Sequence, residues 1–113
     1  MTDMHYSSSF QQQFLQQFDY WQRNMGASAA HQLLAEIIER FERRVQQFPH
    51  GCPRCNDALQ MGFDQYFEYI DSNAQVRIIY RANGSSEGLI ALLFLRTRQS
   101  LRDQLLELIL MQP

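Results

Sequence analysis

Residues 75–100 read QVRIIYRANGSSEGLIALLFLRTRQS, and this stretch decides the fold of the chain. Side chains alternate between the two faces of an extended strand, so the run 76–81 has one apolar face and one face with arginines. Asn83-Gly84 is typical of a turn, and the run 89–95 is typical of a buried strand. The stretch therefore predicts two neighbouring strands of a small sheet.

Four arginines belong to these two predicted strands. Arg77 and Arg81 share one face of the first strand, whereas Arg96 and Arg98 follow the end of the second. A guanidinium is planar, binds oxyanions with two parallel hydrogen bonds and keeps its proton. The pattern therefore predicts a site for phosphates or carboxylates in which arginines act as clamps and not as general bases.

The composition narrows the class of protein. The chain has 113 residues, a formal net charge of −2 and ten basic residues, all of them arginine. This length fits a single domain over residues 1–113, and the near-neutral charge gives no global attraction for nucleic acid. The longest apolar run is far shorter than the roughly 20 residues of a membrane helix, and no signal peptide is recognisable. With only two cysteines, we expect a cytoplasmic protein without membrane partners.

Two amphipathic helices are predicted in the N-terminal half. Ser9 and Gln12 have the spacing of a capping box, and apolar residues recur with helical spacing over 10–25. Ser28 can cap a second helix, whose apolar stripe runs over 30–48. Because the break between the helices is short, we expect them to lie antiparallel.

The remaining elements complete an α+β pattern. Residues 4–8 could form a short first strand, and residues 49–62 read as a loop. A further strand is predicted over 63–71, and Ser100 with Asp103 caps a final helix. The predicted order is strand, helix, helix, three strands and helix.

This order, with the residues at several joints, resembles the RelE/ParE superfamily of bacterial toxins from type II toxin-antitoxin systems. The resemblance covers nearly the whole chain and is carried by Gln47-Phe48-Pro49-His50-Gly51, Leu59-Gln60-Met61-Gly62, Tyr66-Phe67-Glu68, the strand 76–81, the run 92–95 and Arg98-Gln99-Ser100. It implies a helical hairpin packed on a small, mostly antiparallel sheet (β-α-α-β-β-β) with a C-terminal helix. In this fold the first strand lies beside the last.

The resemblance also implies a function. Toxins of this superfamily inhibit growth, can stabilise plasmids and are neutralised by an antitoxin, an acidic protein that is partly disordered when free. RelE-like members cut messenger RNA on the ribosome with basic residues on the concave sheet face and often a terminal tyrosine or histidine. ParE-like members inhibit DNA gyrase without known catalytic residues. This chain lacks lysine and a late aromatic residue, so the ParE-like function is favoured, and a RelE-like endonuclease is the alternative, with His5 beside the arginines.

The resemblance places Arg77, Arg81, Arg96 and Arg98 on strands that match the functional face. There they would bind the antitoxin or a phosphate. The alternative is that the first two pair with Glu68 and other nearby carboxylates, in which case they stabilise the sheet.

A second alternative is a non-toxic interaction module with a structural zinc. His50, Cys52 and Cys55 have a His-x-Cys-x-x-Cys spacing that could supply three zinc ligands. The sequence offers no fourth ligand nearby. We therefore favour a plain loop with two thiols, and expect no metal and no cofactor.

The predicted C-terminal helix has more apolar side chains than one buried stripe requires. Leu106, Leu110 and Met111 broaden its apolar surface. They predict an interface, either with an antitoxin helix or with a second copy of the chain in a homodimer. The alternative is that the whole helix packs on its own sheet.

Overall fold

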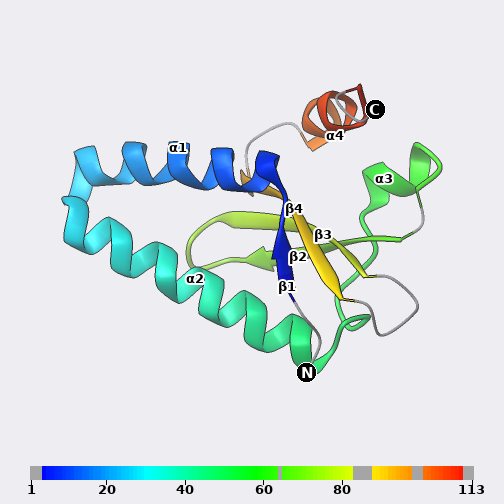
Figure 1. The fold of residues 1–113 in the computed structure, drawn as a ribbon, viewed down its shortest axis with the longest axis horizontal. Helices are drawn as coiled ribbons and strands as arrows, with labels where there is room; N and C mark the ends of the chain where they lie inside the picture. The colour runs from blue at the N-terminus through cyan, green and yellow to red at the C-terminus, as the bar shows by residue number, and fades with distance from the viewer. Residues whose placement is uncertain (1–3, 64, 83–87, 98–100, 111–113) are drawn as a thin grey trace.

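The computed structural model describes residues 4–63, 65–82, 88–97 and 101–110, without the side chains of 101 and 107–110. Its elements follow the predicted order, with one short additional helix (Figure 1). They are β1 (Met4–Tyr6), α1 (Ser8–Met25), α2 (Ala27–Gln47), α3 (Asn56–Gln60), β2 (Tyr66–Asp71), β3 (Val76–Ala82), β4 (Leu89–Arg96) and α4 (Leu101–Leu110). Within the described residues, no helix combines the length and apolar character needed to cross a membrane.

The sheet has the strand order β1-β4-β3-β2, so the first strand lies beside the last, as predicted. β1 is parallel to β4, whereas the other two pairs are antiparallel. Ile79 pairs with Leu93 but Tyr80 pairs with Ala91, which leaves Leu92 as the extra residue of a bulge in β4. A bulge increases the local twist of a strand, and this one lies in the middle of the sheet.

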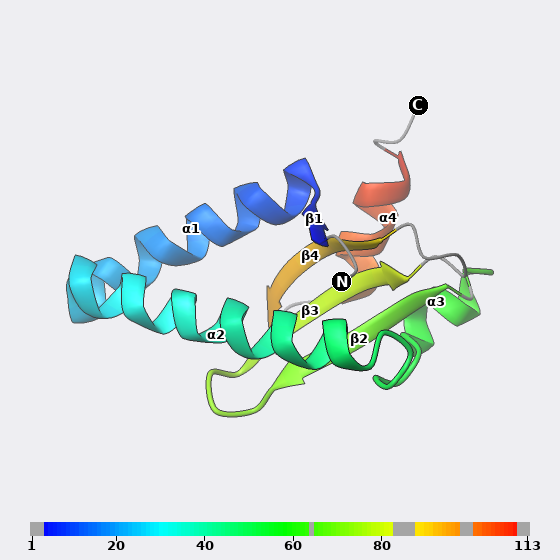
Figure 2. The same cartoon turned by 60° about the horizontal axis from the view of Figure 1, so that its bottom comes forward.

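The two faces of the sheet carry different layers (Figure 2). We call one the hairpin face, because α1 and α2 cover it, and the other the arginine face, because it carries Arg77 and Arg81. Each face has its own hydrophobic cluster. The cluster on the hairpin face contains, among others, Phe10, Leu34, Ile37, Phe41, Val45, Val76, Ile78, Tyr80 and Phe94. The cluster on the arginine face contains Cys55, Ala58, Tyr66, Ile79, Leu92, Leu93, Leu95 and Leu105, and thus includes residues of α3 and α4.

The N-cap of the first helix lies two residues before the predicted cap. The Oγ atom of Ser7, not of Ser9, accepts a hydrogen bond from the backbone N–H of Phe10 at 3.0 Å. The same hydroxyl donates to the carbonyl of Leu92, the bulged residue of β4, at 2.9 Å. Ser7 therefore caps α1 and ties its start to the sheet, an option that Ser9 loses because it already lies inside the first turn.

The residue at the joint between the two helices also lies two positions before the predicted one. Gly26, not Ser28, separates α1 from α2, and its φ of 90° is accessible to glycine at little cost. Its N–H donates to the carbonyl of Gln22 at 2.9 Å, and its carbonyl accepts from the N–H of Ala30 at 3.1 Å. One glycine thus ends one helix and begins the next.

The predicted loop 49–62 contains the helix α3, which the sequence analysis missed. β2 accordingly begins at Tyr66 and not at residue 63. The chain before α3 also runs along the outer edge of β2. The N–H of Cys55 donates to the carbonyl of Tyr66 at 2.8 Å, and the N–H of Glu68 donates to the carbonyl of Pro53 at 2.9 Å.

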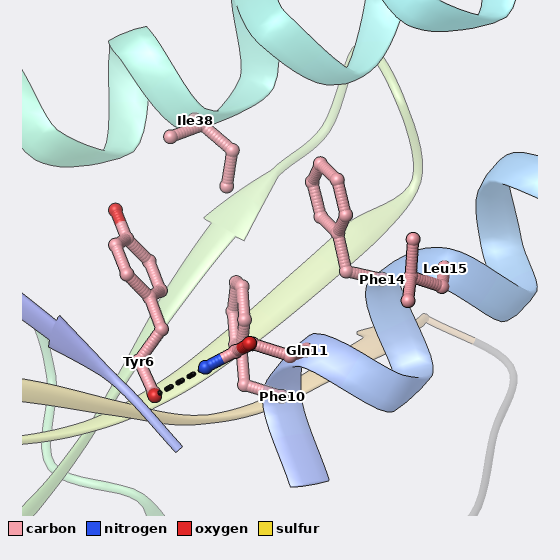
Figure 3. A pocket seen from close by; sticks show the side chains of 6 residues that line it. All are labelled: Tyr6, Phe10, Gln11, Phe14, Leu15 and Ile38. Carbon is pink, nitrogen blue, oxygen red and sulfur yellow. Dashed lines mark hydrogen bonds between the residues drawn. The ribbon is translucent and has the colours of Figure 1, made fainter. Parts of the chain in front are cut away.

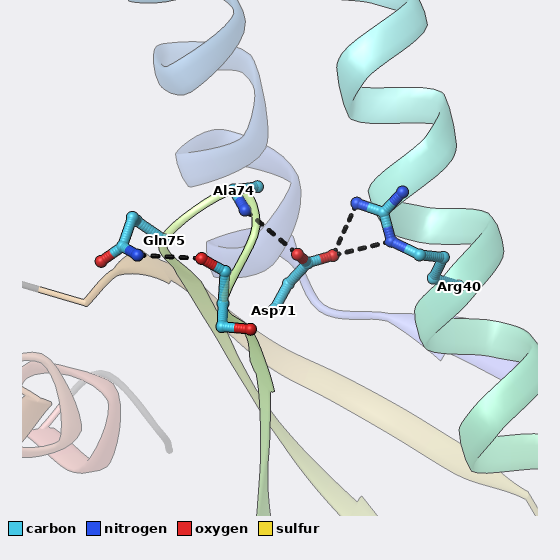
Figure 4. Close-up of polar contacts among 5 residues, drawn as sticks. Arg40, Asp71, Ala74 and Gln75 are labelled. Carbon is cyan, nitrogen blue, oxygen red and sulfur yellow. Dashed lines mark hydrogen bonds and ion pairs between the residues drawn. The ribbon is translucent and has the colours of Figure 1, made fainter.

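The turn between β2 and β3 is fixed to α2 by a buried carboxylate (Figure 4). Oδ2 of Asp71 accepts hydrogen bonds from Nε and Nη2 of Arg40 at 3.0 and 2.8 Å. Its Oδ1 accepts from the backbone N–H of Ala74 at 3.1 Å, which closes the turn. Gln75 then takes a positive φ of 58°, and its side chain donates to the carbonyl of Ser72 at 2.9 Å. These contacts fix the start of β3, the strand that carries Arg77 and Arg81.

Candidate functional site

Arg77 and Arg81 lie on the arginine face, as the alternation of β3 predicted. Arg81 stands in a row across the whole sheet, because it pairs with Tyr66 on one side and with Ile90 on the other. Ile90 pairs in turn with His5 of β1. Paired residues of neighbouring strands present their side chains on the same face. The sheet therefore aligns an imidazole, a guanidinium and a phenol in one row.

Arg77 is held by an internal ion pair. Its Nη1 lies 3.1 Å from Oε2 of Glu68, and the two side chains are 20% and 19% exposed. The alternative of pairing within the sheet is therefore confirmed for Arg77. Arg81 differs because it forms no ion pair with the residues that the structure describes, and its buried Nε has no hydrogen-bond partner among them.

The prediction that four arginines gather in one region is wrong for Arg96. This residue pairs with Val76 and so lies on the hairpin face, with its guanidinium carbon 5.3 Å from the ring centre of Tyr20 in α1. Register decides the face of every residue, since a slip of one position moves a strand's side chains to the other face. The alternation within β3 did not fix its register with β4. Arg98 lies outside the described residues.

The row across the arginine face limits the chemistry available there. His5 is exposed, but two strand spacings separate its backbone from that of Arg81, a distance of about 10 Å. Tyr66 is only 5% exposed, and its ring lies against that of Phe63 with 5.6 Å between centres. The row thus provides a cation beside a phenol, and the residue that carries the imidazole lies two strands away from the arginine.

The structure does not assemble the three predicted zinc ligands. Cys52 belongs to the cluster on the hairpin face and Cys55 to the cluster on the arginine face. His50 is exposed, and its ring packs edge-on against Phe67 at 5.4 Å. Within the described part of the chain, no three His, Cys, Asp or Glu side chains come together as a metal site. Burial raises the pKa of the Cys55 thiol, which keeps it protonated.

The C-terminal helix combines packing on its own sheet with one exposed leucine. Leu105 is only 1% exposed and belongs to the cluster on the arginine face. Leu106, by contrast, is 43% exposed, so part of the predicted interface is accessible. The side chain of Leu110 and the whole of Met111 lie outside the description.

An apolar groove between α1 and α2 was not predicted. We call it the hairpin groove (Figure 3). Its first part encloses about 350 Å³ and is lined by Tyr6, Phe10, Gln11, Phe14, Leu15 and Ile38. A second part of about 560 Å³ shares three of these residues and continues along the helices to His31. The sequence analysis predicted an amphipathic helix over 10–25, and the structure shows that its apolar stripe is left partly open by the second helix.

Polar contacts hold one end of the hairpin groove. The hydroxyl of Tyr6 donates to Oε2 of Glu42 in α2, and the side-chain amide of Gln11 donates to the carbonyl of Tyr6 at 3.0 Å (Figure 3). Burial, together with the hydrogen bond and the charge of Glu42, raises the pKa of the Tyr6 hydroxyl. Leu15 is 61% exposed at the rim of the groove. Leu15 thus extends the apolar lining of the groove to its exposed rim.

The strand order, with the hairpin on one sheet face, is that of the RelE/ParE fold, and solved structures at low sequence identity share it. One is a chain of the chromosomal ParDE toxin-antitoxin system from P. aeruginosa, with a TM-score of 0.68 and 14% sequence identity over 85% of this chain and 96% of that chain. The other is the isolated RelE toxin from E. coli, with a TM-score of 0.53 and 11% identity over 96% of this chain and 99% of that chain. No protein-family model matches the sequence, and no curated protein matches it.

Proposed function

We propose that the chain is the toxin of a type II toxin-antitoxin system and acts in the cytoplasm by binding another macromolecule. The observation that carries this proposal is the similarity of its fold to a chain of a ParDE system over nearly the full length of both. Two surfaces on opposite sides of the molecule, the hairpin groove and the arginine face, give it room for more than one partner.

DNA gyrase is the favoured target. The TM-score is higher for the ParDE chain than for RelE, at 0.68 against 0.53. The chain also has no lysine, and its exposed histidine lies across the sheet from Arg81. Inhibition of a target by binding requires no proton transfer, whereas RNA cleavage requires an acid and a base. The side chains on the arginine face therefore favour inhibition by binding over RNA cleavage.

The antitoxin is expected to use both surfaces. An apolar segment of the partner fits the hairpin groove, since its walls are mostly aromatic and aliphatic. Carboxylates of the same partner match Arg81 and, after displacement of Glu68, Arg77. Leu106 offers an additional contact, either to the antitoxin or to a second copy of the chain.

A ribosome-dependent endonuclease is the second candidate. The similarity to RelE covers 96% of this chain. The row of His5, Arg81 and Tyr66 also crosses the arginine face, which corresponds by resemblance to the functional sheet face of the superfamily. In this case Arg81 would offset the charge that develops on the scissile phosphate.

Induced expression in growing bacteria tests both candidates. We expect growth to stop and DNA breaks to appear before protein synthesis falls. The variant Arg43→Ala removes an exposed arginine of α2 and should remain toxic. It controls for the general effect of losing one positive charge. Arrest of translation with cleaved messenger RNA and intact DNA would favour the endonuclease, and normal growth would contradict both.

A further inference from the structure

The segment that ends α2 and leads to α3 is basic. Residues 43–54 read RRVQQFPHGCPR, with three arginines, one histidine and no carboxylate. The whole chain has a formal net charge of −2, so this segment is a local exception. Its residues Arg44, His50 and Arg54 are all exposed. Positive charge is therefore concentrated at this end of the molecule.

An exposed aromatic ring stands within the basic segment. Phe48 follows the last residue of α2, and it is 49% exposed. Its backbone N–H donates to the carbonyl of Arg44 at 2.9 Å, and the guanidinium carbon of Arg44 lies 5.7 Å from its ring centre. A guanidinium that lies over a ring still directs its N–H groups outward along its edges. Arg44 and Phe48 thus present a cation and an aromatic ring side by side.

A buried aromatic pair supports the rest of the segment. The rings of Phe67 and Tyr80 stack with 5.5 Å between their centres. His50 packs edge-on against Phe67 at 5.4 Å, and Arg54 forms an isolated β-bridge with the same residue. Residues paired in this way present their side chains on the same face. His50 and Arg54 therefore both flank Phe67.

The turn after α2 brings these two parts together. The hydroxyl of Tyr80 donates to the carbonyl of Pro49 at 3.2 Å, and the N–H of Gly51 donates to the carbonyl of Phe48 at 3.0 Å. A Cβ atom at Gly51 would lie only 2.7 Å from that of Phe48, so the turn is tight. Burial raises the pKa of the Tyr80 hydroxyl, and the charge of Arg44 opposes this rise, which shows that the guanidinium lies near the same phenol.

The side chains of this surface select the chemistry of a ligand. Among the described residues, neither Arg44 nor Arg54 forms an ion pair. An acidic peptide would match the two cations but would leave the exposed ring of Phe48 unused. A nucleic-acid strand carries both phosphates and aromatic bases, and its bases can stack on a protein ring when they are not already paired in a duplex.

We propose that Arg44, Phe48, His50 and Arg54 form a binding surface for single-stranded nucleic acid. The arginines contact phosphates, His50 adds a hydrogen-bond donor, and Phe48 stacks on a base. The strand is RNA or DNA, which share this chemistry. The inference goes beyond the proposed toxin function, because none of these four residues lines the hairpin groove or belongs to the arginine face. It can be tested without gyrase, ribosomes or antitoxin.

The test is fluorescence anisotropy of labelled oligouridine and oligothymidine titrated with the purified protein. We expect saturable binding whose logarithm falls with the logarithm of salt concentration with a slope of about −1.4, since two cations each neutralise a phosphate of a single strand. A duplex should bind at least fivefold more weakly. Tighter binding of oligouridine identifies RNA as the ligand, and equal binding identifies either strand. No saturable binding, or equal binding of the duplex, would overturn the proposal.

A competition experiment separates nucleic acid from an acidic protein partner. Oligoglutamate of the same length carries a similar charge but has no aromatic groups. We expect it to displace the labelled strand only at a concentration at least fivefold higher than unlabelled oligonucleotide. Displacement at an equal or lower concentration would assign the surface to an acidic peptide and overturn the proposal.

Substitutions at exposed positions separate charge from stacking. Arg44→Gln and Arg54→Gln should each weaken binding at least threefold at low salt and reduce the salt slope by about half. Phe48→Leu keeps an apolar side chain but removes the ring, so it should weaken binding at least fivefold and leave the slope unchanged.

Two further variants locate the strand on the molecule. Arg23 is exposed in the last turn of α1, beside the start of α2, and α2 is about 30 Å long. Arg23→Gln should therefore leave binding unchanged, and a loss equal to that of Arg44→Gln would reduce the effect to general electrostatics and overturn the site. Loss of binding in Arg81→Gln, with full binding in Arg44→Gln and Arg54→Gln, would place the strand on the arginine face and also overturn it.

Discussion

Arg77 and Glu68 form an ion pair on the arginine face, with 3.1 Å between Nη1 and Oε2. Both side chains are about four-fifths buried, so the pair holds the guanidinium in place. Any acidic partner that binds Arg77 must displace Glu68. Arg81, the next arginine on the same face, forms no ion pair with the described residues. Under the proposed function the two arginines therefore have separable roles, with Arg77 held in the sheet and Arg81 directed to the partner.

Replacement of each arginine by alanine tests this division. Arg81→Ala should weaken the complex with an acidic antitoxin by about 1–3 kcal/mol, the cost of losing one partner of a charge-assisted hydrogen bond. Arg77→Ala should chiefly lower the free energy of unfolding, because it leaves Glu68 partly buried without its cation. Calorimetric titration and urea denaturation measure the two effects. Equal effects of both variants on binding would contradict the division.

The contact between Asp71 and Arg40 should stabilise the fold. Asp71→Ala removes two hydrogen bonds from the guanidinium and one from the N–H of Ala74, so we expect a loss of about 1.5–3 kcal/mol. Glu39→Ala is the matched control, since its ion pair with Arg43 is 67% exposed on both sides and should contribute less than about 0.5 kcal/mol. Urea denaturation followed by tryptophan fluorescence compares them. Similar losses in the two variants would show that the Asp71 contact contributes no more to the free energy of unfolding than an exposed ion pair does.

The thiols should react slowly in the native state. Cys52 and Cys55 are both buried, and the pKa of Cys55 is raised by burial, so little thiolate forms near pH 8. We expect Ellman's reagent to modify both cysteines at least a hundredfold faster in denaturant than in buffer. A chelator should change neither rate. Unfolding or rapid labelling after chelator addition would instead indicate a structural metal.

Tyr6 should cause the free energy of unfolding to fall as the pH rises into the alkaline range. Its folded-state pKa is raised by burial and by Glu42, so its contribution is fully present below the unfolded value of about 10 and is lost as the pH rises above it. Tyr6→Phe removes a hydrogen bond and should cost about 1–2 kcal/mol at pH 8. The difference between wild type and variant should shrink between about pH 9 and 11. A difference that stays constant over this range would contradict the assignment.

The sequence predicted those parts of the fold that depend on local pattern. Alternation in β3 placed Arg77 and Arg81 on one face, and helical spacing found α1 and α2. The five-residue helix α3 was missed, because it is too short to show a period. The cap at Ser7 was missed too, since three serines stand in a row and the end of β1 selects among them.

The surfaces depend on tertiary structure and could not be predicted in the same way. The face of Arg96 follows from the register of β3 with β4, which the pattern of either strand alone does not determine. The hairpin groove depends on how far α1 and α2 separate along their length. An apolar stripe on a helix indicates which residues avoid water, but not whether the partner element covers them fully.

Supercoiling by purified DNA gyrase tests the central claim most directly. The protein is added to gyrase and relaxed plasmid, and a purified translation system with intact messenger RNA is assayed in parallel. We predict that the protein inhibits supercoiling in a saturable manner and that its antitoxin restores the reaction, while translation continues. Full gyrase activity together with cleavage of messenger RNA on ribosomes would contradict the account and assign the chain to the RelE-like function.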